Sequence, residues 1–273
     1  MRVLAVIPAR LGAQRLPQKP LRLLGGVPLV VRVAERVRAC GVADEIVVAT
    51  DADAIRDAVE AAGYNAVLTR DDHPSGTDRV AEVAADSRYR DVDVVLNVQG
   101  DEPFVAREAL EGAVDVVRRG LAPIGTAAAP AAADVLARPD VVKVVTADDG
   151  RALYFSRAPI PFLRETDDAA LRDPLVKQHV GVYAYTPSAL ATWVSLPPHP
   201  LERVERLEQL RPLAHGLAIG VASLAAPVEG GIDTEDDLTR AQARFAEARF
   251  APAATAPAAL PFPPLSSPQS TAS

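Results

Sequence analysis

Leu96-Asn97-Val98-Gln99-Gly100-Asp101-Glu102-Pro103 places an apolar run directly before a glycine and two carboxylates. Such a run is typical of a buried strand in a parallel sheet, because both faces of that strand are covered. Gly100 lets the backbone turn, and Pro103 ends the strand. Ligands of open α/β sheets bind beyond the carboxyl ends of the strands, so we expect Asp101 and Glu102 at the mouth of a site. The competing interpretation is a loop in which Asp101 only caps the next helix.

Short apolar runs alternate with helix-like segments through about residue 130. Strands are predicted at residues 3–7, 45–49, 65–69, 92–98 and 124–128, and helices at residues 28–40, 52–62 and 106–119. This alternation is typical of βαβ units and predicts an α/β fold with a mostly parallel central sheet.

The pattern becomes irregular after residue 130. We predict a hairpin from residues 141–145 and 153–155, a polar loop to about residue 174 and an antiparallel strand at 178–185. A helix with a solvated, salt-bridged face is predicted at 201–210 and a strand at 218–224. The last predicted helix spans 235–248 and is capped by Thr234. Residues 251–273 are uncharged and rich in Ala, Pro, Ser and Thr, which predicts a disordered tail.

Composition excludes several classes of protein. The chain has 273 residues and a formal net charge of -7, whereas a generic nucleic-acid-binding surface is basic. Its single cysteine, Cys40, excludes internal disulfides and cysteine-based zinc clusters. The apolar residues Val3–Ala9 are too few to span a membrane, and Arg10 follows them at once. We therefore expect a cytoplasmic protein that binds neither nucleic acid nor membrane.

A loop with three cations follows the first predicted strand. Arg10, Arg15 and Lys19 lie among Pro and Gly residues, without the spacing of a Walker A loop or a G-x-G-x-x-G fingerprint. Guanidinium groups bind phosphate oxygens in pairs, and an ammonium group adds a mobile charge, so the loop suits an oligophosphate. A solvated loop is the alternative.

Two further segments allow two interpretations each. In Thr69–Arg79, Ser75 either caps a helix together with Asp78 or offers its hydroxyl to a polar ligand near that helix start. His179 is as consistent with a hydrogen-bonded structural histidine as with a ligand contact.

Nine motifs then occur in an order that resembles one enzyme family. They are Ile7–Arg10, Arg15–Leu21, Thr69–Arg79, Asn97–Pro103, Lys143–Val145, Tyr154–Arg157, His179–Tyr183, Leu207–Arg211 and Gly231–Thr234. Together they resemble the 3-deoxy-manno-octulosonate cytidylyltransferases, the CMP-Kdo synthetases of lipopolysaccharide assembly, from about residue 2 to residue 245. The chain departs from the family pattern at Gln18, where a glycine often stands, and over residues 162–176.

The resemblance implies a fold and a reaction. The fold is a nucleotide-diphospho-sugar transferase-like three-layer sandwich with a mostly parallel central sheet and a small antiparallel insertion for dimerisation and sugar binding. One domain would span residues 1–250, with a nucleotide part at about 1–130 and 210–250 and a sugar and dimer part at about 131–210. A homodimer would use CTP, 3-deoxy-D-manno-octulosonate (Kdo) and Mg²⁺ to form CMP-Kdo and pyrophosphate.

The resemblance also implies roles for individual residues. The catalytic residues are Lys19, Arg15, Asp101 and Asp233, of which Asp101 and Asp233 hold the metal. Nucleotide binding falls to Pro8, Ala9, Arg10, Arg15, Lys19, Ser75, Gly76, Arg79 and Asp101. Sugar binding falls to Gln99, Arg157, His179, Tyr183, Glu208 and Gln209. Arg157 suits the sugar carboxylate because a guanidinium group pairs with a carboxylate through two bonds.

Three alternatives compete with this function. One is the same chemistry on another acidic sugar, such as a sialic acid or amino-substituted Kdo. A non-catalytic nucleotide-binding protein is the second, and the presence of Asp101 and Asp233 together with Lys19 argues against it, because a mere binder would not need two metal carboxylates. The third is a Rossmann oxidoreductase, against which the missing glycine-rich fingerprint speaks.

Overall fold

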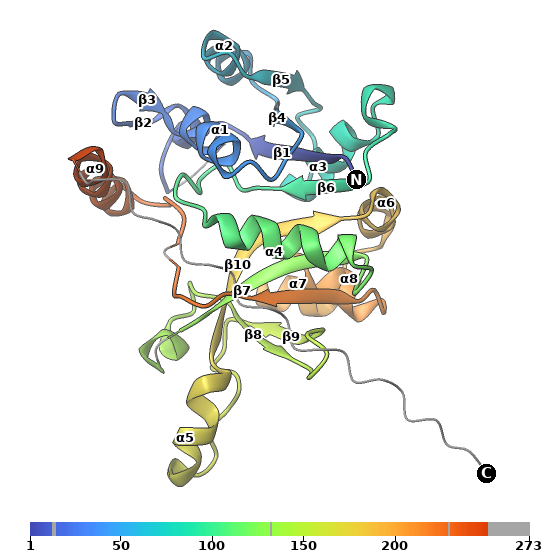
Figure 1. Cartoon of the computed structure of the whole chain (residues 1–273), viewed down its shortest axis with the longest axis vertical. Helices are drawn as coiled ribbons and strands as arrows, with labels where there is room; N and C mark the ends of the chain where they lie inside the picture. The colour runs from blue at the N-terminus through green and yellow to red at the C-terminus, as the bar shows by residue number, and fades with distance from the viewer. Residues whose placement is uncertain (13–14, 132, 229, 251–273) are drawn as a thin grey trace.

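A nine-stranded sheet forms the centre of the computed structural model, which describes residues 1–12, 15–131, 133–228 and 230–250 (Figure 1). Its strands are β1 (Val3–Ala9), β4 (Glu45–Thr50), β5 (Asn65–Leu68), β6 (Val94–Asn97), β7 (Ile124–Pro130), β8 (Lys143–Thr146), β9 (Ala152–Ser156), β10 (Lys177–Tyr185) and β11 (Ile219–Ser223). The predicted disordered tail, residues 251–273, lies outside the described residues.

Helices and one small hairpin surround the sheet. The hairpin is formed by β2 (Leu23–Leu24) and β3 (Val27–Pro28), and the helices are α1 (Leu29–Cys40), α2 (Asp53–Ala61), α3 (Gly76–Ala84), α4 (Arg107–Arg118), α5 (Ala169–Arg172), α6 (Pro187–Ser195), α7 (Pro200–Glu205), α8 (Leu210–Ala214) and α9 (Glu235–Phe250). Within the described residues, no helix combines the length and the apolar character that crossing a membrane requires.

The order of the main strands is β11-β7-β10-β6-β1-β4-β5. The strands β6, β1, β4 and β5 are parallel to one another, and β11 is parallel to β7. Only β10 interrupts this arrangement among the strands of that order, since it is antiparallel to both β6 and β7. The predicted mostly parallel sheet is therefore confirmed, and β10 places residues from the second half of the chain beside β6.

The two faces of the sheet carry separate cores. Val3, Ala5 and Ile7 of β1 pack in one cluster with apolar side chains of α1, α2 and α4. Leu4 and Val6 point the other way and pack in a second cluster with α3, α6 and α8. Side chains alternate across a strand, so a continuous apolar run such as Val3–Ile7 needs a cover on both faces. This is the three-layer sandwich that the resemblance implies.

The antiparallel part projects from one end of the sheet. β8 and β9 pair with each other, and β8 joins the main sheet through β10. Between β9 and β10 the chain forms an arm that carries α5, drawn away from the main sheet in Figure 1. The sequence predicts only a polar loop there, so the short helix α5 is an addition.

One predicted helix is wrong in its extent. The segment 201–210 is not one helix, because α7 ends at Glu205 and α8 begins at Leu210. Arg206 between them adopts a left-handed conformation with φ of 55°, which stops the helix although the spacing of charged residues continues. Glu208 lies in the turn between these two helices. Helix α6 was not predicted at all.

The predicted caps are confirmed. The Ser75 side chain accepts a hydrogen bond from the Asp78 backbone N–H at the start of α3. The Thr234 hydroxyl accepts from the Asp237 backbone N–H, and the Asp237 carboxylate accepts from the Thr234 N–H in return. This reciprocal pair fixes the start of α9 directly after Asp233.

Candidate active site

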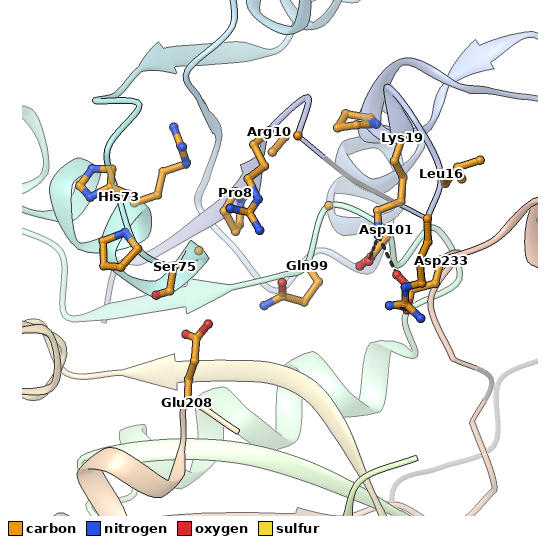
Figure 2. Close-up of a pocket in the computed structure, with 18 residues that line it drawn as sticks. Pro8, Arg10, Leu16, Lys19, His73, Ser75, Gln99, Asp101, Glu208 and Asp233 are labelled. Atoms are coloured by element: carbon orange, nitrogen blue, oxygen red, sulfur yellow. Dashed lines mark hydrogen bonds and ion pairs between the residues drawn. The ribbon is translucent and has the colours of Figure 1, made fainter. Parts of the chain in front are cut away.

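A pocket of about 780 Å³ lies beyond the carboxyl ends of β1 and β6 (Figure 2). Five stretches of chain contribute to it: the cationic loop, the start of α3, the loop after β6, the turn that carries Glu208 and the turn that carries Asp233. The lining residues are Pro8, Ala9, Arg10, Gly12, Arg15, Leu16, Lys19, Pro20, His73, Pro74, Ser75, Gly76, Arg79, Gln99, Gly100, Asp101, Glu208 and Asp233. Every residue predicted to bind the nucleotide or to act in catalysis lines this pocket.

Close backbone contacts hold the loops that form the pocket floor. A Cβ atom on Gly100 would lie 2.8 Å from the Pro8 carbonyl oxygen, so the loops after β1 and β6 approach more closely than a side chain permits. A Cβ atom on Gly231 would lie 3.1 Å from the Asp101 carbonyl oxygen. In addition, the Ile232 backbone N–H donates to that same oxygen at 2.9 Å. These contacts bring Asp233 beside Asp101.

Lys19 links the two aspartates. Its Nζ donates to Asp101 Oδ2 at 2.5 Å and to Asp233 Oδ1 at 3.0 Å, the contacts dashed in Figure 2. Arg15 donates to the other oxygen of Asp233 at 3.0 Å. Burial opposes the charged form of Lys19, but the two carboxylates outweigh it and raise the Lys19 pKa above its usual value. Asp101 therefore does not cap α4, whose first turn follows Ala106, and the capping interpretation is wrong.

Glu102 adds a third carboxyl group behind this pair. Burial, together with the neighbouring charges of Asp101 and Asp233, raises the Glu102 pKa to about 8. Its Oε1 lies 3.1 Å from the place where a Cβ of Gly231 would stand, so the Gly231 turn covers it closely. The sequence predicts Glu102 at the mouth of the site, but in the structure Glu102 does not line the pocket and lies against the Gly231 turn.

The opposite end of the pocket is built by the start of α3. Arg79 is 3% exposed, and its guanidinium donates to Asp51 Oδ2 at 2.7 Å and to the Thr69 hydroxyl. His73 also lines this end and contacts the Glu82 carboxylate through Nε2. The hydroxyl of Ser75 caps α3, which confirms one interpretation of this segment. Ser75 also lines the pocket, so a contact to a ligand stays a prediction.

Two of the predicted sugar-binding residues lie in the pocket. Gln99 stands between the cationic loop and the start of α3, and Glu208 reaches toward Ser75 from below in Figure 2. The buried Thr77 hydroxyl donates to Glu208 Oε2 at 3.0 Å and holds this carboxylate in place. Loss of water around it raises the Glu208 pKa above its usual value.

The other four predicted sugar residues do not line this pocket. The guanidinium of Arg157 donates to the carbonyl oxygens of Glu205, Pro139 and Arg206. The His179 ring packs between Phe155 and Tyr183, with ring centroids 5.0 and 5.4 Å apart, and its Nε2 contacts the Thr126 hydroxyl at 3.0 Å. Tyr183 and Gln209 are buried.

Sequence reasoning missed several lining residues. His73 and Pro74 stand inside the quoted motif Thr69–Arg79, directly before Ser75, and their position beside a predicted ligand-binding hydroxyl was a usable signal. Gly12, Leu16 and Pro20 flank the three cations of the cationic loop. Thr77 does not line the pocket but holds Glu208, and its place in the motif could not reveal this contact, because Glu208 lies 131 residues away in the sequence.

The carboxylates suit a hard divalent cation. Asp101 and Asp233 converge on one ammonium nitrogen, so their oxygens already face a single positive centre. Over the described ranges, no group of three or more His, Cys, Asp or Glu side chains is arranged as a metal site. Two carboxylates agree with the way Mg²⁺ is held in many nucleotide enzymes, where water and substrate phosphates complete the shell.

Comparison with known proteins places this pocket in a family. The cytidylyltransferase family model matches residues 4–219. A 3-deoxy-manno-octulosonate cytidylyltransferase of Gemmatimonas aurantiaca is 69% identical over 245 residues, which cover 90% of this chain and 95% of that protein. A solved structure of CMP:2-keto-3-deoxy-manno-octonic acid synthetase complexed with CTP has a TM-score of 0.83 and 37% identity, covering 91% of this chain and 100% of the other.

A more distant structure shares the fold alone. A cytidylyltransferase of Leptospira borgpetersenii has a TM-score of 0.58 and 17% identity over 90% of this chain and 87% of its own. The two more similar proteins instead cover 90% and 91% of this chain at 69% and 37% identity. The chain therefore belongs to the cytidylyltransferase family, in the branch of the 3-deoxy-manno-octulosonate cytidylyltransferases.

Proposed function

We propose that this chain transfers the CMP group of CTP to the anomeric hydroxyl of Kdo, forming CMP-Kdo and pyrophosphate for lipopolysaccharide assembly. The hydroxyl oxygen bonds to the α-phosphorus, the bond from that phosphorus to the bridging oxygen of the β-phosphate breaks, and the hydroxyl proton is released. The observation that carries the proposal is one pocket lined by three cationic side chains of a single loop, by two carboxylates and by the polar start of α3.

Transfer of a nucleotidyl group depends on alignment and on neutralising charge. Arg10, Arg15 and Lys19 supply positive charge on one loop, where the triphosphate would lie. Ser75, Gly76 and Arg79 line the end that would take the cytidine. Gln99 and Glu208 lie between these ends and would contact the sugar hydroxyls.

We further propose Mg²⁺ as the cofactor, held by Asp101 and Asp233. When bound, Mg²⁺ would polarise the phosphate and lower the pKa of the attacking hydroxyl. The two aspartates would fix its position, and the bond from the Ile232 N–H to the Asp101 carbonyl would keep their loops together.

The cell compartment and the oligomeric state complete the proposal. We propose a cytoplasmic enzyme, because the substrate CTP belongs to the nucleotide pool of the cytoplasm. A homodimer is supported by large apolar side chains left exposed on β9, on the arm around α5 and on α7. They are Leu153, Phe162, Leu171, Leu175 and Val204, with exposed fractions of 60, 80, 72, 56 and 82%.

Pyrophosphate release tests the reaction. The full chain is incubated with CTP and Mg²⁺ and with Kdo, amino-substituted Kdo, a sialic acid or no sugar, and each reaction is repeated with EDTA. We expect release with Kdo and Mg²⁺ only. Release with another sugar alone would keep the chemistry and reject the substrate. Binding of CTP without release under any condition would favour a non-catalytic nucleotide-binding protein.

The Asp101→Asn variant tests the metal carboxylate. We expect kcat to fall by about 100-fold or more, since a group that stabilises transition-state charge commonly contributes that much. The matched control is Asp236→Asn, which removes an exposed carboxylate three residues after Asp233 and is expected to leave kcat within about twofold. Full activity of Asp101→Asn at ordinary Mg²⁺ concentration would contradict the assigned role.

A further inference from the structure

Lys19 stands in an unusual place for a phosphate-binding lysine. Its Nζ does not point freely into the pocket but lies between Asp101 Oδ2 and Asp233 Oδ1, at 2.5 and 3.0 Å. The side chain is 17% exposed, and those of Asp101 and Asp233 are 23% and 43% exposed. The ammonium group thus occupies the positive centre on which the two metal-binding carboxylates of the proposed function converge.

We propose that Lys19 is the built-in counterion of the free protein: it holds the metal position between Asp101 and Asp233 until the triphosphate of the nucleotide draws it away. The inference rests on the proposed function, because it takes these two carboxylates as the metal site. It adds an order of events, in which tight metal binding at this pair follows nucleotide binding.

Electrostatics makes the two occupants exclusive. Two carboxylates held around one point repel each other unless a cation stands between them, and partial burial strengthens that repulsion. Lys19 supplies the cation in the free protein. A divalent cation at the same oxygens would meet the ammonium as a like charge, so Lys19 must leave before the metal settles. A triphosphate on the same loop offers the departing ammonium a new anionic partner.

The exchange needs movement of a side chain only. The backbone of Lys19 is held by hydrogen bonds from its own N–H to the Leu16 carbonyl at 3.1 Å and from the Arg22 N–H to its carbonyl at 3.2 Å. Leu16 itself is fully buried in a small core with residues of α9. The flexible four-carbon stem of lysine can rotate on this fixed base.

Coupling between the two ligands is reciprocal. If the nucleotide raises metal affinity by releasing the aspartates, the metal raises nucleotide affinity by the same factor. Lys19→Met removes the ammonium group but keeps an unbranched side chain. This variant should therefore bind the metal more tightly than the wild type when no nucleotide is present.

Mn²⁺ is the probe for the first experiment, with free Mn²⁺ measured by electron paramagnetic resonance in the absence of nucleotide. We expect the full-chain Lys19→Met variant to bind Mn²⁺ at least about fivefold more tightly than the wild type, the lower end of typical coupling factors. The double variant Lys19→Met with Asp101→Asn should lose this gain, which places the ion at the aspartate pair. Arg22→Met is the matched control: its partner is Glu235, and it should leave Mn²⁺ affinity unchanged.

Lysine labelling tests the same exchange in the wild type, should Lys19→Met fail to fold. The chain has three lysines, Lys19, Lys143 and Lys177. An amine-reactive ester followed by mass spectrometry should label Lys19 poorly in the free protein and more strongly as Mn²⁺ saturates the aspartates. Lys143 is fully buried and Lys177 lies on β10, so both serve as internal references whose labelling should not change.

Equal Mn²⁺ affinity of the wild type and a folded Lys19→Met variant, or Lys19 labelling that does not respond to Mn²⁺, would overturn the counterion role. Pyrophosphate release with Kdo would in that case still stand as evidence for the proposed function. Failure of the function itself would appear separately, as absence of pyrophosphate release with every sugar.

Discussion

Buried cationic side chains in this protein are surrounded by hydrogen-bond acceptors. Arg79 has a carboxylate and a hydroxyl, whereas the fully buried Lys143 donates to the carbonyl oxygens of Arg138, Val141 and Arg157 at 2.9, 2.8 and 2.5 Å. Burial lowers the pKa of Lys143, and the three carbonyls keep its ammonium group supplied with partners. His179 differs, because its packed ring faces two aromatic neighbours and no carboxylate of the described residues is hydrogen-bonded to it.

Acid should destabilise the fold through His179. Burial lowers the pKa of His179 to about 3, whereas an unfolded histidine titrates near 6.5. Between these values only the unfolded chain binds the proton, so stability is lost as the pH falls through this window. From pH 7.5 to pH 5 the loss from this residue is about 2 kcal/mol.

Urea unfolding at the two pH values measures this loss. We expect the His179→Gln variant to lose less stability than the wild type on going from pH 7.5 to pH 5. The matched control is His215→Gln, at an exposed position after α8, which should keep the wild-type loss. An identical loss in His179→Gln and the wild type would contradict the buried-histidine account.

Whole elements follow the sequence where the local pattern and the tertiary environment agree. β1, β4 and β6 each contain a continuous apolar run that the sheet buries, so their prediction is confirmed. The pattern fails where one residue breaks it: Arg206 takes a left-handed conformation that no local residue type signals, and it separates α7 from α8. Helix α6 did have a signal, Thr186 as a cap followed by Pro187.

The site residues likewise divide into those whose place the sequence could predict and those whose contacts it could not. Lys19, Asp101 and Asp233 follow predicted elements directly, so the topology of parallel strands brings them to one edge of the sheet. The guanidinium of Arg157 stands at the end of a long side chain, and its direction depends on carbonyl groups from two distant segments. Sequence position fixes the backbone of such a residue but not the place of its charge.

The junction of the β1 and β6 loops should be sensitive to a single methyl group. Gly100→Ala would place a Cβ atom 2.8 Å from the Pro8 carbonyl oxygen, and that backbone atom cannot move without shifting β1. We expect a loss of about 1–3 kcal/mol in the free energy of unfolding, typical of overpacking. We also expect at least about a tenfold fall in kcat/KM for CTP, since both loops line the pocket.

Chemical denaturation and steady-state kinetics check this prediction. The matched control is Gly12→Ala in the same pocket, where an added Cβ atom would meet no atom within 4 Å. It should keep wild-type stability. Equal behaviour of the two variants would show that the loops can separate freely.

The whole molecule presents two unlike ends. At one edge of the sheet β5 pairs with β4 alone and leaves Leu68 46% exposed. At the other end stand β8, β9 and the α5 arm, where Phe162 and Leu171 are 80% and 72% exposed. Exposed apolar side chains of this size are typical of a surface that another chain covers.

The proposed homodimer should therefore depend on the α5 arm. The double variant Phe162→Ser with Leu171→Ser is expected to shift the molar mass from dimer to monomer, because it removes two large apolar groups from the interface. Light scattering after size-exclusion chromatography measures the mass. Leu68→Ser at the distant β5 edge is the control and should remain a dimer. A dimer that persists in the double variant would place the interface elsewhere.

The hydrogen bond from Lys19 to Asp233 joins residues 214 positions apart. During synthesis, Lys19 and Asp101 are made early, and Asp233 only after β11. Domains begin to fold as they emerge from the ribosome. The growing chain can thus form its cationic loop while Lys19 has only the Asp101 carboxylate as a partner, before Asp233 has been made. If Asp233 holds the metal as proposed, catalytic competence arrives with the last tenth or so of the described residues, and chains that end before Asp233 should add no activity to the cell's supply of enzyme.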